Sequence, residues 1–158
     1  MRQFSVSDDG DGGSTGRFAG LVPQSLAVRA LSVAVRGPDT VTVGEPARFV
    51  VAVKNRLPVA VRVTHPTSRV WGWRVDDVPE ADERGLEPPE ATRATVLSGG
   101  ERRTFEATWD GRIRRRGDDG DRWVAYPGRV DFTGYLAVPD WRARGAYDEL
   151  SVEVSAEH

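Results

Sequence analysis

No cysteine occurs among the 158 residues of the chain. Without cysteine the protein has no disulfide scaffold, no thiol nucleophile and no thiolate metal site. The absence also fits a reducing compartment, and we expect the protein to be cytoplasmic.

Long apolar runs are also absent. No segment approaches the roughly 20 apolar residues that a membrane-spanning helix needs, and the N-terminal sequence MRQFSVSDDGDGGSTG has no apolar core of a signal peptide. The formal net charge is only −2, so no overall field indicates a nucleic acid or a membrane as the partner. We therefore expect no membrane association.

Lysine is almost absent, because Lys54 is the only one and arginine supplies the rest of the strongly basic side chains. The acidic residues lean towards aspartate. A GC-rich genome would produce this usage, and so would adaptation to high salt, so a salt-adapted source is one of two interpretations.

Valine is abundant, which favours strands over helices. Residues 48–54 (RFVVAVK) and 59–64 (VAVRVT) alternate apolar and polar side chains with a period of two, and a short break at 55–58 separates them. Such a pair of segments predicts a β-hairpin. The side chains expected to point into the core are Phe49, Val51, Val53, Val59, Val61 and Val63.

The same alternation recurs along the rest of the chain and predicts further strands. Residues 26–35 (LAVRALSVAV) change parity near Ala30, so we expect a strand with a bulge there. The other expected strands cover residues 41–43, 69–75, 94–96, 103–109, 130–138 and 150–154. No amphipathic helix of ten or more residues is recognisable. The predicted fold class is all-β, an immunoglobulin-like β-sandwich of seven to nine strands.

The strand pattern places the folded domain at residues 23–156. Residues 1–22 are rich in glycine, serine and aspartate and have little to bury, so we expect a disordered N-terminal tail. Within the domain, the residues predicted to be largely buried are Phe49, Val51, Val61, Trp71, Trp109, Phe132 and Leu136.

Two long connections between the expected strands are candidate binding loops. Asp76–Thr92 is acidic and contains three prolines, whereas Asp110–Gly128 is rich in arginine and glycine. We predict that residues Arg112–Tyr126 of the second loop contribute more binding than the first loop, because they combine arginine with aromatic residues that often anchor interfaces. Trp141, in another connection, is a further contact candidate. The predicted partner-binding residues are Arg112, Arg114, Arg115, Arg116, Trp123 and Tyr126.

The arginine run at 112–116 could instead bind phosphate or a nucleic acid. Asp118, Asp119 and Asp121 follow directly, and we expect them to neutralise the run in a solvated, self-paired hairpin tip. Nucleic acid is therefore not the expected partner.

Groups suited to catalysis or metal binding are sparse. His65 is the only internal histidine, and we interpret it as a loop residue, since a nucleophilic site would need a serine and an acid gathered around it. Asp8–Gly12 and Asp118–Asp121 resemble calcium loops, but neither continues to a glutamate at the required spacing. We expect no enzymatic activity, no bound metal and no cofactor.

Five short features follow one another in an order that resembles a known family. In chain order they are Val53-Lys54-Asn55 with Pro58–Val61, Val70–Trp73, Leu97–Glu101, Phe105–Asp110, and Pro127-Gly128-Arg129 leading to Leu136. Together they resemble the intracellular proteinase inhibitor (BsuPI-like) family, whose domains are immunoglobulin-like sandwiches. The resemblance spans Val41 to Val138 and implies inhibition of a protease by a loop. The segment Val41–Asn55 equally resembles adhesion-type immunoglobulin modules of bacteria and archaea.

The sequence thus predicts a non-enzymatic cytoplasmic binding module. Its expected partner is a protein, and a protease is the partner that the family resemblance implies. One alternative is a structural or assembly domain that pairs by a sheet edge or a sheet face. Another is a nucleic-acid binder that uses the arginine-rich loop.

Overall fold

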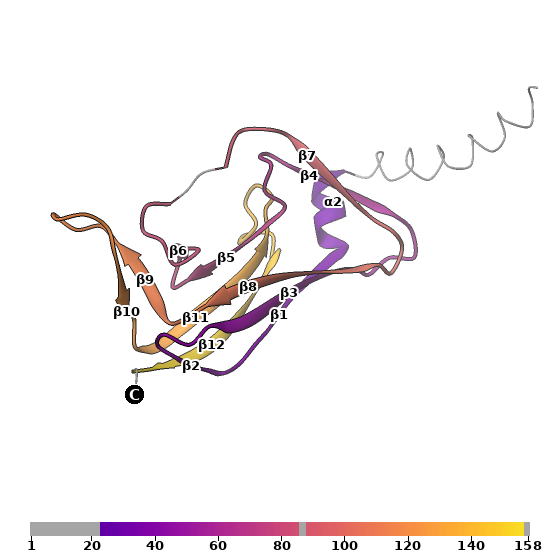
Figure 1. Cartoon of the computed structure of the whole chain (residues 1–158). Coiled ribbons are helices and arrows are strands. Elements are labelled where there is room, and N and C mark those ends of the chain that lie inside the picture. The colour runs from indigo at the N-terminus through magenta and orange to yellow at the C-terminus, as the bar shows by residue number, and fades with distance from the viewer. Residues whose placement is uncertain (1–22, 86–87, 157–158) are drawn as a thin grey trace, which may run out of the picture.

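Two β-sheets face each other and enclose the core (Figure 1). The computed structural model describes residues 23–85 and 88–156. The first sheet has the antiparallel order β1-β3-β8, and the second has the order β2-β12-β11-β5-β6, in which β2 runs parallel to β12. The predicted all-β, immunoglobulin-like sandwich is confirmed.

The strands of the two sheets are drawn from distant parts of the chain. The first sheet comprises β1 (Leu31–Arg36), β3 (Ala47–Asn55) and β8 (Arg102–Trp109). The second comprises β2 (Thr40–Thr42), β5 (Trp71–Val75), β6 (Val78–Pro79), β11 (Gly128–Leu136) and β12 (Tyr147–Ser155).

Two smaller sheets and a short helix complete the described chain. Strand β4 (Val61–His65) pairs with β7 (Arg93–Leu97), β9 (Arg112–Arg115) pairs with β10 (Arg122–Ala125), and the helix α2 (Gln24–Arg29) precedes β1. The described residues form twelve strands rather than seven to nine. The excess arises because β6, β9 and β10 lie within the two connections that were expected to be loops.

The core lies between the two large sheets. Phe49 of β3 stacks on Phe132 of β11 with ring centroids 4.0 Å apart, and both side chains are fully buried. The sheets approach closely at Gly134 of β11, where a Cβ atom would lie 2.5 Å from a methyl group of Val51. Six of the seven predicted core residues are buried, namely Phe49, Val51, Val61, Trp109, Phe132 and Leu136.

Trp71 is the exception among the predicted core residues, because it is only half-buried. It lies near the edge of the second sheet and stacks on Phe105 of the first sheet at 5.2 Å between ring centroids. Alternation places a side chain on the inner face of a sheet but does not show how close the strand lies to the edge. Trp71 therefore packs against the core but is less buried than the other six residues.

The predicted hairpin between residues 48–54 and 59–64 is also wrong. Strand β3 pairs with β1 and β8, whereas β4 pairs with β7. The connection between them is held by Asn55, which is fully buried. Its side-chain Nδ2 donates to the carbonyl groups of Val59, Leu97 and Ser98, at 2.8, 3.2 and 3.0 Å. Val59, expected in the core, is 40% exposed in this connection.

The first predicted strand begins as a helix. Residues 24–29 form α2 and β1 starts at Leu31, so the change of parity at Ala30 marks a helix-to-strand junction and not a bulge. The helix forms through tertiary contacts: Ala27 and Val28 are buried, and the Gln24 amide exchanges two hydrogen bonds with the backbone of Thr64. The expected disordered tail at 1–22 lies outside the described residues.

His65 is a buried strand residue and not a loop residue. It ends β4 with no exposed surface, and its two ring nitrogens lie 2.9 Å from the Ala137 carbonyl oxygen and 2.8 Å from Thr95 Oγ1. Within residues 23–85 and 88–156, no helix is long and apolar enough to cross a membrane.

Candidate partner-binding site

The arginine-rich connection is a β-hairpin that extends away from the two large sheets (Figure 1). We name residues 112–125, which include β9 and β10, the arm. Its register places Arg114 opposite Trp123 and Arg115 opposite Arg122. The expected hairpin is present, and its strands β9 and β10 lie in a segment that the sequence predicts to be a loop.

The base of the arm is anchored in the core. Ile113 of β9 is buried, and the indole Nε1 of Trp109 donates a 2.7 Å hydrogen bond to the Arg112 carbonyl. The backbone N–H of Tyr126 donates to the Gly111 carbonyl at 2.9 Å. The arm therefore starts from fixed positions on both of its strands.

The free side of β9 is covered by residues 81–84 of the acidic connection. The Arg114 N–H donates to the Ala81 carbonyl at 2.8 Å, and the Glu83 N–H donates to the Arg114 carbonyl at 2.9 Å. Asp82 and Arg114 form an isolated parallel bridge. The two connections that the sequence suggested as separate binding loops thus form one structure.

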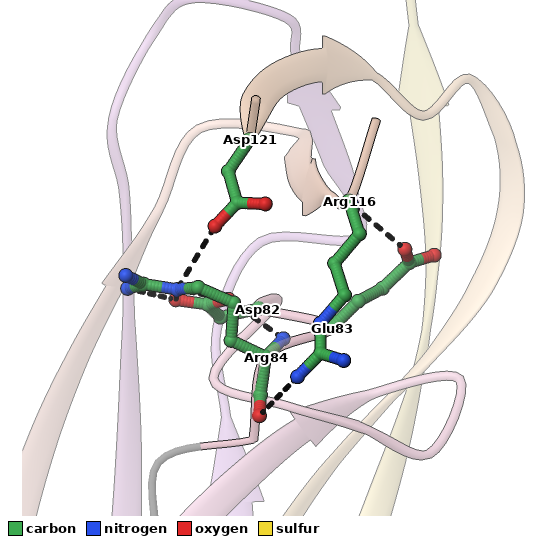
Figure 2. A network of polar contacts seen from close by, with 5 residues as sticks. All are labelled: Asp82, Glu83, Arg84, Arg116 and Asp121. Carbon is green, nitrogen blue, oxygen red and sulfur yellow. Dashed lines mark hydrogen bonds and ion pairs between the residues drawn. The ribbon is translucent and has the colours of Figure 1, made fainter. Parts of the chain in front are cut away.

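Side-chain contacts reinforce this backbone pairing, as Figure 2 shows. The Asp82 carboxylate accepts hydrogen bonds from Nε and Nη2 of Arg84, and Arg84 Nε lies 3.9 Å from Asp121 of the arm. The Arg116 N–H donates to Glu83 Oε2, and its Nη2 donates to the Arg84 carbonyl, both at 3.4 Å. Hydrogen bonds from Arg84 lower the pKa of Asp82, so this carboxylate remains charged in the network.

Most of the predicted arginines are engaged within the molecule. Arg112 lies 3.6 Å from Asp110, and Arg115 lies 3.6 Å from Glu83. Asp121, which was expected to neutralise the run, makes its ion pair with Arg84 instead. The run is therefore balanced largely by acids from outside the hairpin tip, because the neighbouring connection folds against it.

Trp123 presents its side chain to solvent. It is 52% exposed on the outer strand of the arm, opposite Arg114. Tyr126 differs, because it is half-buried and its hydroxyl group donates to Asp76 Oδ2 at 3.0 Å. Burial, with this hydrogen bond, raises the pKa of Tyr126. The arm thus presents the exposed aromatic face of Trp123 on a hairpin whose base is fixed.

Trp141, the further contact candidate, packs within the molecule. Its ring stacks on Tyr135 at 4.3 Å between centroids, and the guanidinium groups of Arg74 and Arg142 lie 5.4 and 4.9 Å from its centroid. The side chain covers the outer face of the second sheet and is half-buried. Its role in the structure is thus to hold the connection after β11.

The sequence did not indicate a cavity of about 410 Å³ beside β5. Trp71, Trp73 and Phe105 supply aromatic surface, and Arg69, Glu80 and Arg93 supply charge. The two tryptophans of the segment RVWGW were the signal that could have indicated this site. Alternation predicts only that both side chains face the core. Within the described part of the chain, no three His, Asp or Glu side chains gather as a metal site would require.

Comparisons with known proteins identify a family and several solved structures that are similar in part. A family model described as a family of unknown function (DUF7974) matches residues 19–155. No curated protein matches the chain. Among solved structures, the CARDB domain of a Pyrococcus furiosus protein is 15% identical with a TM-score of 0.48, over 79% of this chain and 94% of that one.

Two enzymes of known structure also contain a similar region. A β-glucosidase from Listeria innocua is 15% identical with a TM-score of 0.49, over 81% of this chain and 16% of the enzyme. An alkylpurine DNA glycosylase from Pseudomonas fluorescens, bound to DNA with an abasic site analogue, is 15% identical with a TM-score of 0.45, over 80% of this chain and 31% of the enzyme. At these values the similarities assign neither an activity nor a partner to the chain.

Proposed function

The chain belongs to the DUF7974 family, and from that premise we propose that it is a non-enzymatic module that binds a partner protein through the arm. Trp123 is the central contact residue of this proposal. The observation that carries it is the 52% exposure of this tryptophan on a hairpin that is otherwise held by hydrogen bonds and ion pairs.

The energetics of binding favour such an arrangement. Tryptophan is enriched among the residues that contribute most to interfaces, and ordering a mobile loop on binding costs free energy. The contacts of residues 81–84 with β9 fix the arm before any partner arrives. An aromatic anchor on a preorganised hairpin therefore docks with a small loss of entropy.

The proposal that the module is not an enzyme is supported by the surroundings of its internal histidine. Both ring nitrogens of His65 are within hydrogen-bond distance of protein oxygens, and the side chain has no exposed surface. A general base must reach a proton on its substrate. His65 is held away from any substrate in solution.

The test is capture of the partner from native cell extract by the tagged chain, followed by mass spectrometry and affinity measurement with the purified partner. Trp123→Ala should retain the melting temperature and weaken binding at least tenfold, since truncation of a central anchor typically costs more than about 1.4 kcal/mol. Val96→Ala is the matched control, because Val96 is 47% exposed on β7, away from the arm. Equal affinity of Trp123→Ala and the parent would refute the assignment.

Inhibition of a protease is a narrower form of the same proposal. It is supported by the shape of the arm, since a braced hairpin that extends from a sandwich can enter an enzyme cleft. Assays of serine, cysteine and metalloproteases from the native cell, with and without the chain, test it. Inhibition should be lost in Trp123→Ala and retained in Val96→Ala.

A further inference from the structure

The cavity beside β5 lies along an open sheet edge. Strand β5 pairs with β11 on one side, and on the other side β6 reaches only Arg74 and Val75. Within the described ranges, no strand pairs with the outer side of β5 between Trp71 and Trp73. The lining of the cavity includes this same stretch of β5.

The backbone groups at this edge point into the cavity region. The Trp73 carbonyl accepts a 3.0 Å hydrogen bond from the Glu80 N–H, so it faces away from β11, whereas the Val70 carbonyl accepts from the Ala137 N–H on the β11 side. In a strand the N–H and C=O of one residue point to the same side, and this side alternates from residue to residue. The N–H groups of Trp71 and Trp73 and the Trp71 carbonyl therefore face outward.

Aromatic surface adjoins these groups. Trp71, Trp73 and Phe105 line the cavity and are each half-buried. Trp71 stacks on Phe105 across the two sheets, and Trp73 stacks on Phe132 of the core at 5.4 Å between centroids. The rings are thus fixed on their inner sides, and their remaining surface is available to an apolar side chain.

The charge of the cavity is positive on balance. Arg69 forms an ion pair with Glu80. Arg93 donates to the Ser68 carbonyl at 3.3 Å, and no carboxylate in the described part of the chain forms an ion pair with it. Two arginines and one glutamate leave a site that favours a carboxylate in its occupant.

We propose that this cavity binds an extended peptide segment of a partner protein, which adds to β5 as a further strand. Its backbone pairs with the N–H and carbonyl of Trp71 and reaches the N–H of Trp73, whose carbonyl is held by Glu80. An apolar side chain packs against the aromatic rings, and an Asp or Glu side chain contacts Arg93. Main-chain pairing supplies affinity in such strand addition, and side-chain pockets supply specificity. The volume of about 410 Å³ lies in the range of sites that hold small ligands, so it can hold side chains of a bound peptide. This surface is separate from the arm.

The experiment pans a phage library of random dodecapeptides against the whole chain and measures the affinity of enriched synthetic peptides by fluorescence anisotropy. Enriched peptides should alternate apolar and polar residues and contain an acid. Arg93→Glu should lower the affinity for these peptides at least tenfold. The control is Arg62→Glu, because Arg62 is an exposed arginine of β4 outside the cavity, and it should change the affinity less than twofold. Trp123→Ala should bind them as the parent does.

A second measurement uses an intact protein and a modified peptide, so it does not depend on the folding of a variant. Methylation of the peptide nitrogen that pairs with the Trp71 carbonyl should weaken binding at least tenfold, and peptide binding should slow hydrogen exchange at the Trp71 and Trp73 amides.

Several outcomes would overturn the proposal. They are an absence of enriched peptides, equal affinity for Arg93→Glu and the parent, or indifference to N-methylation. Protection of the two amides in a self-associated chain without peptide would assign the edge to a second copy. If the peptides bind only after residues 1–22 are removed, the occupant of the cavity is this segment of the chain itself and not a partner.

Discussion

At the scale of single residues, the Asn55 side chain fixes the connection between β3 and β4 through hydrogen bonds. It is the only asparagine of the sequence, and its buried amide joins the connection after β3 to the turn between β7 and β8. Its Oδ1 also accepts a 3.0 Å hydrogen bond from the Leu57 N–H. The side chain thus replaces the hairpin pairing that alternation alone predicted.

We predict that Asn55→Ala lowers the free energy of unfolding by about 1–3 kcal/mol, because it leaves buried carbonyl groups without a donor. Urea denaturation monitored by tryptophan fluorescence measures the change. Arg56→Ala, at the neighbouring exposed position, is the control and should cost less. A loss below about 0.5 kcal/mol for Asn55→Ala would mean that the connection is held in another way.

His65 makes stability depend on pH. Burial lowers its pKa below the ordinary value of 6.5, against a hydrogen bond to Ala137 that raises it. Since a carbonyl only accepts, Nδ1 carries the proton and Nε2 accepts from the Thr95 hydroxyl group in the neutral ring. The folded state therefore favours neutral histidine more than the unfolded state does.

The sign of the effect follows from proton uptake on unfolding. Below pH 6.5 the unfolded chain binds a proton at this position that the folded chain does not yet bind, so stability falls as the pH decreases towards the folded pKa. Above that range the contribution is fully present. Denaturation at pH 7.5 and at pH 5.5 measures the free energy of unfolding at each pH. This free energy should fall less between the two pH values in His65→Gln than in the parent. An equal loss in both proteins would contradict the assignment.

At the scale of elements, the arm depends on residues 81–84. Asp82 is only 8% exposed and binds Arg84 through two carboxylate oxygens, while the backbone of Ala81 and Glu83 pairs with Arg114. This pairing couples the arm to the turn after β6. Positive φ angles at Glu80 and Ala81, 52° and 56°, form that turn.

We predict that Asp82→Ala destabilises the fold by about 1 kcal/mol, which is less than a buried charged hydrogen bond contributes, because Arg84 is partly exposed and solvent screens the pair. Its larger effect should be local: hydrogen exchange at the Arg114 and Glu83 amides should accelerate. Asp118→Ala, at the exposed tip of the arm, should leave both exchange rates unchanged. Unaltered exchange in Asp82→Ala would show that the side-chain network does not hold the arm.

The positions of strands could be predicted from the sequence better than their partners. Alternation in residues 103–109 and 130–138 marked β8 and most of β11, because an inner-facing side chain every second residue is a local property. Pairing is not local, so the pattern could not show that β3 lies between β1 and β8. Alternation therefore predicts a hairpin at residues 55–58, because nothing in these residues reveals that the chain passes to another sheet.

The candidate site was predictable in part for the same reason. Trp123 and the arginine run were noted from composition, and the structure places them on one hairpin. The contact of that hairpin with Asp82 and Glu83 joins residues about 30 positions apart, and no spacing rule relates them. Parity predicts that the tryptophans of β5 face the core, whereas the open edge beside them depends on the short length of β6, which the pattern does not show.

At the scale of the whole molecule, the sandwich separates stability from recognition. Phe49, Phe132 and Gly134 join the two sheets, and none of these residues is exposed. The arm and the β5 edge are different surfaces of this scaffold, and the turn at Glu80 and Ala81 lies between them, since Glu80 lines the cavity and Ala81 pairs with Arg114 of the arm. Variants distant from this turn, such as Trp123→Ala and Arg93→Glu, are expected to leave the other surface and the core intact.

The most direct test of the central proposal places a photoreactive benzoyl-phenylalanine at position 123 or at position 96 in living cells. Irradiation should join the chain to one partner protein from position 123, and not from position 96, which is 47% exposed on β7, apart from the arm (Figure 1). The adduct should disappear when unmodified parent chain competes in excess. Adducts of the same protein from both positions, or none from position 123, would contradict the arm as the partner-binding surface.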